Sequence, residues 1–188
     1  MAVVSVLDNR PSFETVLKQY HKKIYNLALR VLGNADEAAD LTQETFVKAY
    51  NAYSRFQGED SALYPWLCRI AVNGCKNRFR EISRRVRFEA VSLDKPLETD
   101  SGGLSLELGD DSSDPAGIAE HREMEQMIQC AITELPQEYR VIVVLRDIQG
   151  LSYKEIAEAT GQKIENVKVR LYRGRQILRR RLSNYISD

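Results

Sequence analysis

The sequence predicts an all-α protein of two small helical domains joined by a flexible acidic linker, with a helix-turn-helix in the C-terminal domain. Three observations predict this fold class. Apolar residues recur at spacings of three and four through most of the 188-residue chain, which is typical of amphipathic helices. A stretch rich in Gly, Ser, Pro and Asp interrupts that pattern at residues 89–115. Charge is segregated along the chain, although the formal net charge is zero.

The charge pattern divides the chain. Residues 76–88 carry six basic and one acidic side chains, and residues 151–188 carry nine and four. Residues 89–125, which lie between them, carry two basic and eleven acidic side chains. Two basic segments that flank an acidic connector indicate surfaces for polyanions. Because the connector has few apolar residues, we expect a linker at 89–115 between domains at 1–88 and 116–188.

The N-terminal domain begins with two predicted helices. The first, FETVLKQYHKKIYNLALRVL, places one apolar stripe at Val16, Tyr20, Ile24, Leu27 and Val31. The second restarts after a Gly-Asn pair with acidic residues in its first turn, as the helix dipole favours. It is apolar around much of its circumference and carries an acidic stripe at Asp36, Asp40 and Glu44. Such a helix lies either in the middle of its own domain or against a second protein that carries basic residues.

A third helix is predicted after the turn-like segment QGEDSA, with Pro65 at its first position. One face is apolar, with Leu63, Leu67, Ile70, Ala71 and Gly74. The other face gathers Arg69, Asn73, Lys76 and Arg80, and Trp66 lies at its edge. A basic stripe with an amide and an aromatic border suits single-stranded or flipped bases, because cations hold phosphates and an indole can stack. Taken by itself, Trp66 is better interpreted as an ordinary core residue.

The C-terminal domain is predicted to begin with two further helices. IAEHREMEQMIQCAITEL forms the first, which Pro136 ends, and QEYRVIVVLRDIQG forms the second, which Gly150 closes. The apolar run at residues 141–145 could also be a strand. No partner strand is evident in the sequence, so a buried helix is favoured.

Residues 151–176 have the layout of a helix-turn-helix. Ser152 and Glu155 form a capping-box signature, and Gly161 stands where the turn is expected. Ile156 and Ala157 are expected to face inward, and the second helix is expected to start near Ile164.

The second helix of this motif has two chemically different faces. Its predicted buried face carries Ile164, Val167, Leu171, Gly174 and Leu178. The opposite face presents Glu165, Lys168, Val169, Tyr172, Arg173 and Gln176. Arg and Lys pair with guanine acceptors, Gln pairs with adenine, and apolar atoms meet the thymine methyl, so this face suits the major groove of DNA. A solvated basic face is the general alternative, whereas a membrane-surface helix would need a broader apolar face.

Other classes of protein find little support. No apolar run approaches the roughly 18–20 residues that cross a bilayer, and the N-terminus lacks the features of a signal peptide, so a cytoplasmic protein is expected. Cys68, Cys75 and Cys130 are odd in number and lack metal-ligand spacing, which predicts buried thiols and neither a metal site nor a cofactor. No catalytic motif is present, so an enzyme is not expected.

Three long motifs resemble one family. DEAADLTQETFVKAY resembles the polymerase-binding helix of bacterial extracytoplasmic-function (ECF, group 4) sigma factors, and SRFQGEDSALYPWLCRIAVNGCKNRFR resembles their promoter-opening region. ITELPQEYRVIVVLRDIQGLSYKEIAEATG, followed by VKVRLYRGRQILRRRL, resembles their minus-thirty-five-reading domain. The resemblance covers residues 13–88 and 116–182. It implies a promoter-specificity subunit that binds core RNA polymerase and helps to melt promoter DNA, in a stress or envelope response.

The resemblance also implies residue roles. The protein would contact core polymerase at the beta-prime clamp and at the beta flap. The residues at the clamp would be Asp40, Gln43, Glu44 and Phe46. The minus-ten element would be held by Phe56, the loop through Ala62, Asn73 and Lys76, to which the basic face adds Trp66, Arg69 and Arg80. The minus-thirty-five element would be read by Lys168, Arg170, Tyr172 and Arg173, together with Glu165, Val169 and Gln176 of the same face. An anti-sigma factor, in some members anchored in the membrane, would hold the protein inactive at the inner face of that membrane.

The sequence departs from the family pattern in the recognition helix. The usual turn G-T-V-[KR]-S-R is replaced by ENVKVR at residues 165–170. Gly174 replaces the usual Ala, which costs about 1 kcal/mol of helix propensity. The acidic linker is expected to run through the polymerase cleft, and to fold back over the basic faces when polymerase is absent. The alternative function is a stand-alone helix-turn-helix regulator whose N-terminal domain dimerises.

Overall fold

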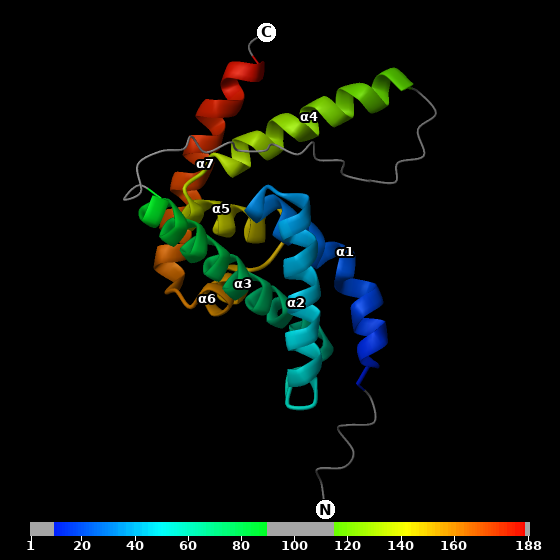
Figure 1. Ribbon diagram of the computed structural model, residues 1–188. Coiled ribbons are helices and arrows are strands. Elements are labelled where there is room, and N and C mark those ends of the chain that lie inside the picture. Colours follow the sequence, from blue (N-terminus) through cyan, green and yellow to red (C-terminus); the bar gives the residue numbers. More distant parts are fainter. Residues whose placement is uncertain (1–9, 90–114, 187–188) are drawn as a thin grey trace, which may run out of the picture.

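The computed structural model describes residues 10–89 and 115–186, and every regular element in these ranges is helical (Figure 1). The predicted all-α fold class is therefore confirmed. The predicted linker fold-back lies outside the described residues. The elements are α1 (Phe13–Leu32), α2 (Ala35–Tyr53), α3 (Asp60–Glu89), α4 (Pro115–Thr133), α5 (Gln137–Val143), a π-helical turn η1 (Val144–Ile148), α6 (Tyr153–Thr160) and α7 (Ile164–Ile186).

Side-chain caps fix the starts of the first two helices. The Ser12 hydroxyl accepts from the backbone N–H of Thr15 at the start of α1, and Asn34 caps α2 in the same way. Gly33 ends α1 at φ 76°, a left-handed conformation that glycine adopts without a steric penalty. The apolar stripe predicted for α1 is buried along its whole length.

The third helix starts earlier than predicted. α3 begins at Asp60, so Pro65 lies inside the helix and the predicted position at its first turn is wrong. Leu63 and Leu67 are both buried in the core, and the packing of this continuous apolar face outweighs the backbone hydrogen bond that proline removes. The turn-like segment is correspondingly shorter.

The apolar run at residues 141–145 is helical, and all five side chains are buried. The helix widens into η1, where the N–H of Gln149 donates to the carbonyl oxygen of Val144 at 3.0 Å, five residues earlier. The buried-helix prediction is confirmed, and the extra residue in the turn shifts the side chains that follow.

The helix-turn-helix forms as predicted. Ser152 and Glu155 make a complete capping box on α6, and Gly161 ends that helix at φ 69°. Gly174 of α7 lies so close to α5 that a Cβ atom would be 2.8 Å from Cγ2 of Val143. Ile164 departs from the prediction, because it is the first residue of α7 and lies beyond the packing contact, where it is exposed.

The helices of the two predicted domains pack on each other. α3 contacts α6, and α1 contacts α4, α5 and η1 (Figure 1). One hydrophobic core runs through both groups of helices. α4 and the end of α7 extend beyond this core in Figure 1.

Polar side chains reinforce the junction between the two groups. Arg140 of α5 donates to the carbonyl oxygens of Val31 (2.9 Å), Leu135 (3.0 Å) and Thr133, and its guanidinium lies 5.7 Å from the ring centroid of Phe79. Burial lowers the pKa of Arg140. Two of these contacts, with Val31 and with Phe79, join α5 to the N-terminal helices, so Arg140 is one of the polar links between the two groups.

Candidate nucleic-acid and polymerase-binding surfaces

The outer side of α2 carries an apolar groove. The groove lies between α1 and α2 and encloses about 660 Å³. Phe46 is 6% exposed and packs edge-to-face on Phe13, whereas Val47 and Tyr50 are 56% and 65% exposed. An exposed apolar groove of this kind marks a site where another molecule docks.

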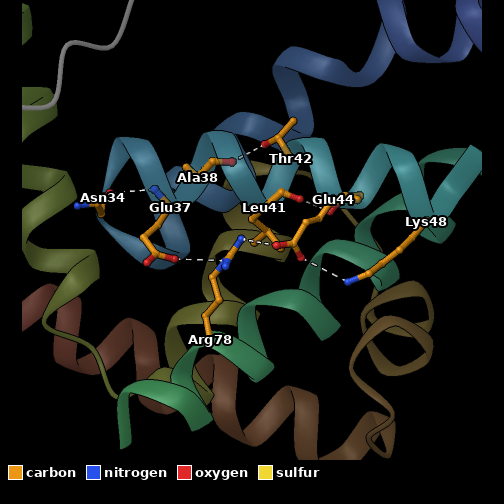
Figure 2. A network of polar contacts seen from close by, with 9 residues as sticks. Asn34, Glu37, Ala38, Leu41, Thr42, Glu44, Lys48 and Arg78 are labelled. Carbon is orange, nitrogen blue, oxygen red and sulfur yellow. Dashed lines mark hydrogen bonds and ion pairs between the residues drawn. The ribbon is translucent and has the colours of Figure 1, made fainter. Parts of the chain in front are cut away.

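The four predicted polymerase contacts divide between two sides of α2. Gln43 and Phe46 line the groove, whereas Asp40 and Glu44 do not. Figure 2 shows that Glu44 faces α3, where its carboxylate pairs with Arg78 at 3.0 Å. The same arginine lies 3.3 Å from the carboxylate of Glu37, an ion pair without hydrogen-bond geometry. Glu44 is therefore partly engaged in holding α2 on α3.

The basic face of α3 is only partly open. Arg69, Asn73 and Arg80 are exposed, as predicted. Lys76 lies against α6 and donates to the carbonyl oxygen of Thr160 at 2.7 Å. Burial lowers the pKa of Lys76, and the charge of Arg80 lowers it further. The contact with α6 thus occupies one of the predicted base-holding side chains.

The aromatic residues at the start of α3 form a cluster rather than a free stacking platform. Trp66 is partly buried, with its ring 4.9 Å from Phe56 and 6.5 Å from Tyr53 between centroids. Phe56 is also partly buried, and Ala62 lies in the first turn of the helix. The structure thus brings Phe56 and Trp66 together. Because Trp66 is partly buried, it is partly a core residue.

The outer face of α7 is open. Val169 is 48% exposed and Tyr172 is 66% exposed, and Glu165, Lys168 and Arg173 are exposed beside them. The Lys168 ammonium lies 5.9 Å from the ring centroid of Tyr153, which begins α6. Five of the predicted side chains therefore form one continuous surface that is free to enter a groove of DNA.

Two residues of α7 that were predicted to contact DNA, Gln176 and Arg170, are not on this open surface. Gln176 is half-buried at the edge of the face. Arg170 points toward α5, where its guanidinium pairs with Glu138 at 2.9 Å. Because Arg170 follows Val169 by one residue, a helical rotation of 100° carries it from the open face toward the bundle.

Comparisons with known proteins agree with the motifs. The family model for Sigma-70 region 2 matches residues 16–85, and the model for Sigma-70, region 4 matches residues 125–178. The ECF RNA polymerase sigma-E factors of Salmonella typhimurium (strain LT2) and Escherichia coli (strain K12) are each 34% identical over 170 residues, which is 90% of this chain and 86% of theirs.

The chain belongs to the ECF sigma factors of RNA polymerase. It is a sigma subunit for transcription initiation. The presence of both sigma regions in one chain disfavours the stand-alone regulator, which accounts only for the helix-turn-helix.

Solved structures support the fold of this sigma factor. The sigma factor RpoE from Bartonella quintana, solved with the anti-sigma factor NepR, has a TM-score of 0.69 at 23% identity, over 91% of this chain and 96% of that one. CnrH, solved with the cytosolic domain of CnrY, has a TM-score of 0.61 at 20% identity, over 95% and 92%.

The remaining sequence predictions concern thiols, metals and membranes. Cys68 and Cys75 of the sigma factor are buried free thiols, as predicted, whereas Cys130 is exposed, which contradicts the prediction because it lies on the outer side of α4. In the described ranges no group of His, Cys, Asp and Glu could hold a metal ion. No helix within residues 10–89 or 115–186 is long and apolar enough to cross a bilayer.

Sequence reasoning missed the polar contacts that bind the recognition helix to its own domain. Asp147 of η1 pairs with Arg175, and Glu134 pairs with Arg181. It also missed the hydrogen bond from the Tyr64 hydroxyl to Gln149, which joins α3 to the turn after η1. These pairs are separated by 28 to 85 residues along the chain, so no local pattern identifies them.

Proposed function

We propose that this sigma factor docks on core RNA polymerase through α2, captures minus-ten bases with α3 and reads the minus-thirty-five duplex with α7. The proposal divides the chain into domains at residues 1–88 and 116–188 with a linker at 89–115. The observation that carries it is the open, mixed basic and apolar face of α7 in a chain that matches both sigma regions.

The apolar groove supports the docking step. Gln43 and Phe46 lie in the groove beside the exposed side chains of Val47 and Tyr50. Apolar anchors bordered by Asp40 and Glu44 suit a polymerase surface that offers both apolar and basic side chains, as the beta-prime clamp would. The beta flap is assigned to the C-terminal domain by the family resemblance alone.

The DNA-contacting residues follow from the two helices. On α3 we assign Phe56, Ala62, Trp66, Arg69, Asn73, Lys76 and Arg80 to the minus-ten element. On α7 we assign Glu165, Lys168, Val169, Arg170, Tyr172, Arg173 and Gln176 to the minus-thirty-five element. Arg170 would have to leave Glu138 to reach DNA, so its assignment carries an additional energetic cost.

Promoter binding requires the two domains to separate. Elements centred about 25 base pairs apart lie about 85 Å apart along B-DNA, at about 3.4 Å for each pair. The Lys76 ammonium lies 2.7 Å from Thr160, which precedes α7 by four residues. The α3 and α7 faces therefore cannot reach both elements while these contacts persist, and binding to core polymerase would have to break them.

We assign this protein no catalytic activity of its own, since it acts as a specificity subunit. We further propose that it works in the cytoplasm, and that an anti-sigma factor anchored at the inner membrane face holds it inactive. The support is that the similar chains RpoE and CnrH were solved with NepR and with the cytosolic domain of CnrY.

Transcription with purified components tests the proposal. Core polymerase with and without the protein is incubated with fragmented genomic DNA, and transcript 5′ ends are sequenced. We expect starts that need the protein and share sequence elements centred near minus ten and minus thirty-five. Duplex binding without core binding would instead favour the stand-alone regulator.

A further inference from the structure

A basic cleft lies between the two domains. It encloses about 460 Å³, with α3 on one side and α5, α6 and α7 on the other. Its polar lining is dominated by Lys76, Arg80, Arg84 and Arg87 of α3 and Arg170 of α7, and its apolar lining comes from Phe79 and Val141. The four cations of α3 follow one another at spacings of four, four and three, so they share one helix face over about 16 Å.

Within residues 10–89 and 115–186, carboxylates balance only part of the positive charge of this cleft. Its single carboxylate, Glu138, is paired with Arg170. In the described part of the chain, Arg80 contacts only the side-chain oxygen of Asn77, at 3.3 Å. Within residues 10–89 and 115–186, Arg84 and Arg87 form no ion pair or hydrogen bond. Several like charges that converge on one concavity raise the local anion concentration, because the low-dielectric walls focus their field.

Two further observations indicate that the cleft fits a compact ligand. The side-chain oxygen of Gln162 lines the cleft and is buried without a hydrogen-bond partner in the described part of the chain; since phosphate oxygens only accept, it could accept only from a sugar hydroxyl or a base N–H of a nucleoside polyphosphate. The volume of about 460 Å³ lies in the range of small-molecule sites.

We propose that the cleft binds a multivalent phosphate anion, a polyphosphate chain or a nucleoside polyphosphate, and that this ligand holds the two domains together. Arginine forks match phosphate oxygens with paired hydrogen bonds, and three arginines on α3 with a fourth, Arg170, on the opposite wall suit a ligand with three or more charges. Because one wall belongs to each domain, the site is complete only in the packed arrangement. The ligand therefore opposes the domain separation that promoter binding requires, and this consequence alone depends on the proposed function.

Calorimetric titration of the full chain with sodium tripolyphosphate at low ionic strength tests the site. We expect saturable binding of one ligand for each chain. The double variant Arg84→Gln/Arg87→Gln should bind at least about tenfold more weakly, because it removes two unpaired cations. Arg85→Gln is the matched control, since it removes an equally exposed charge of α3 that does not line the cleft, and it should stay within about twofold.

A second variant tests whether both domains contribute. Arg170→Gln removes a cation from the opposite wall and leaves Glu138 uncompensated, so it should weaken tripolyphosphate binding about tenfold or more. Its control is Arg173→Gln on the open face of α7, which should bind normally. Circular dichroism checks that all variants remain folded. Full affinity in Arg170→Gln would place the ligand on α3 alone and overturn the interdomain site.

Competing ligands separate the remaining outcomes. Equal binding of tripolyphosphate and guanosine triphosphate identifies the phosphate chain as the recognised group, and preference for the nucleotide identifies a nucleoside polyphosphate. Tighter binding of a ten-residue glutamate peptide or of single-stranded DNA would overturn the proposal in favour of a macromolecule. Equal losses in the double variant and in Arg85→Gln would also overturn it, as would the absence of saturation. No readout uses transcription, so failure here leaves the proposed function untouched.

Discussion

The two candidate DNA faces, on α3 and on α7, differ in how much of each the fold leaves accessible. Both carry basic and amide side chains at helical spacing. The α7 face is open over most of its length, with Val169 and Tyr172 at its centre, although Arg170 is paired with Glu138 and Gln176 is half-buried. The α3 face is interrupted where Lys76 contacts Thr160 and where Phe79 is buried under Arg140.

This difference shows that a helical pattern defines a face without deciding what covers it. α7 packs on α5 and α6 of its own domain through its apolar side, while Arg170 and Arg175 pair with Glu138 and Asp147 of that domain. α3 must pack on α1 and α2 and also meets α6, so two sides of it are used. The predicted face of α7 is therefore largely accessible in this arrangement, whereas the predicted face of α3 is partly covered by α6.

The largest expected effect comes from breaking the junction that covers α3. Arg140→Ala removes three hydrogen bonds to carbonyl oxygens and the contact with Phe79, and should lower the free energy of unfolding by about 2–4 kcal/mol. Urea denaturation measures this loss. Arg173→Ala, on the open face, should change it by less than about 0.5 kcal/mol. Equal stabilities of the two variants would mean that Arg140 does not hold the junction.

The open face of α7 is tested by the same Arg173→Ala variant in DNA binding. We expect holoenzyme affinity to fall by about 1–3 kcal/mol and sequence preference to relax at one or two positions of the minus-thirty-five element. Binding to a library of promoter sequences measures both quantities. A uniform loss on every sequence would reassign Arg173 to a phosphate contact.

The α3 face is tested by Asn73→Ala. Asn73 is exposed, so the variant should fold normally and form closed complexes on duplex DNA. We expect open-complex formation, followed by permanganate footprinting, to fall about tenfold, because an amide that holds an unstacked base acts after the duplex has bound. Glu81→Gln, two turns further along an exposed part of α3, is the control. Normal open-complex formation by Asn73→Ala would show that Asn73 does not hold a minus-ten base.

The packing that exposes the α7 face is tested by Gly174→Ala. The new Cβ would lie 2.8 Å from Cγ2 of Val143 and 3.3 Å from Cβ of Tyr139. Overpacking costs about 1–3 kcal/mol and helix propensity returns about 1 kcal/mol, so we expect a net loss of about 1 kcal/mol in unfolding free energy. Asn166→Ala, at an exposed site of α7, should be neutral or stabilising. A stabilised Gly174→Ala protein would show that α7 can move off α5 at little cost.

The smallest expected effect is on the reactivity of the thiols, which reports whether α3 stays covered by α6. Burial raises the pKa of Cys68 and of Cys75 to about 12, and the charge of Glu155 in α6 adds to the rise at Cys68. Since the thiolate is the reactive form, alkylation at pH 8 should modify exposed Cys130 first and the other two at least about 100-fold more slowly. Mass spectrometry resolves the sites. Faster modification of Cys68 in Arg140→Ala would report separation of α6 from α3, and rapid modification in the unaltered chain would contradict the packed arrangement.

Much of the fold was predictable because its signals are local. Capping residues such as Ser152, the turn at Gly161 and the stripe of α1 each act within a few residues, so they can be recognised in sequence. Pro65 was misplaced because the burial of Leu63 and Leu67 is a tertiary effect that local propensity does not contain. Ile164 was misplaced because periodicity alone does not say where a packing contact ends.

For this sigma factor, the sequence by itself determined the helices, the helix-turn-helix, the family and the two faces suited to nucleic acid. Periodicity, caps and charge are properties of neighbouring residues, and they survive in any arrangement of the helices. Only the tertiary structure decided that Lys76 contacts Thr160, that α7 packs closely on α5 at Gly174, and that cations of α3 share a cleft with Arg170. These contacts join residues far apart in the chain, and they form because burying one common core brings the helices of both domains together.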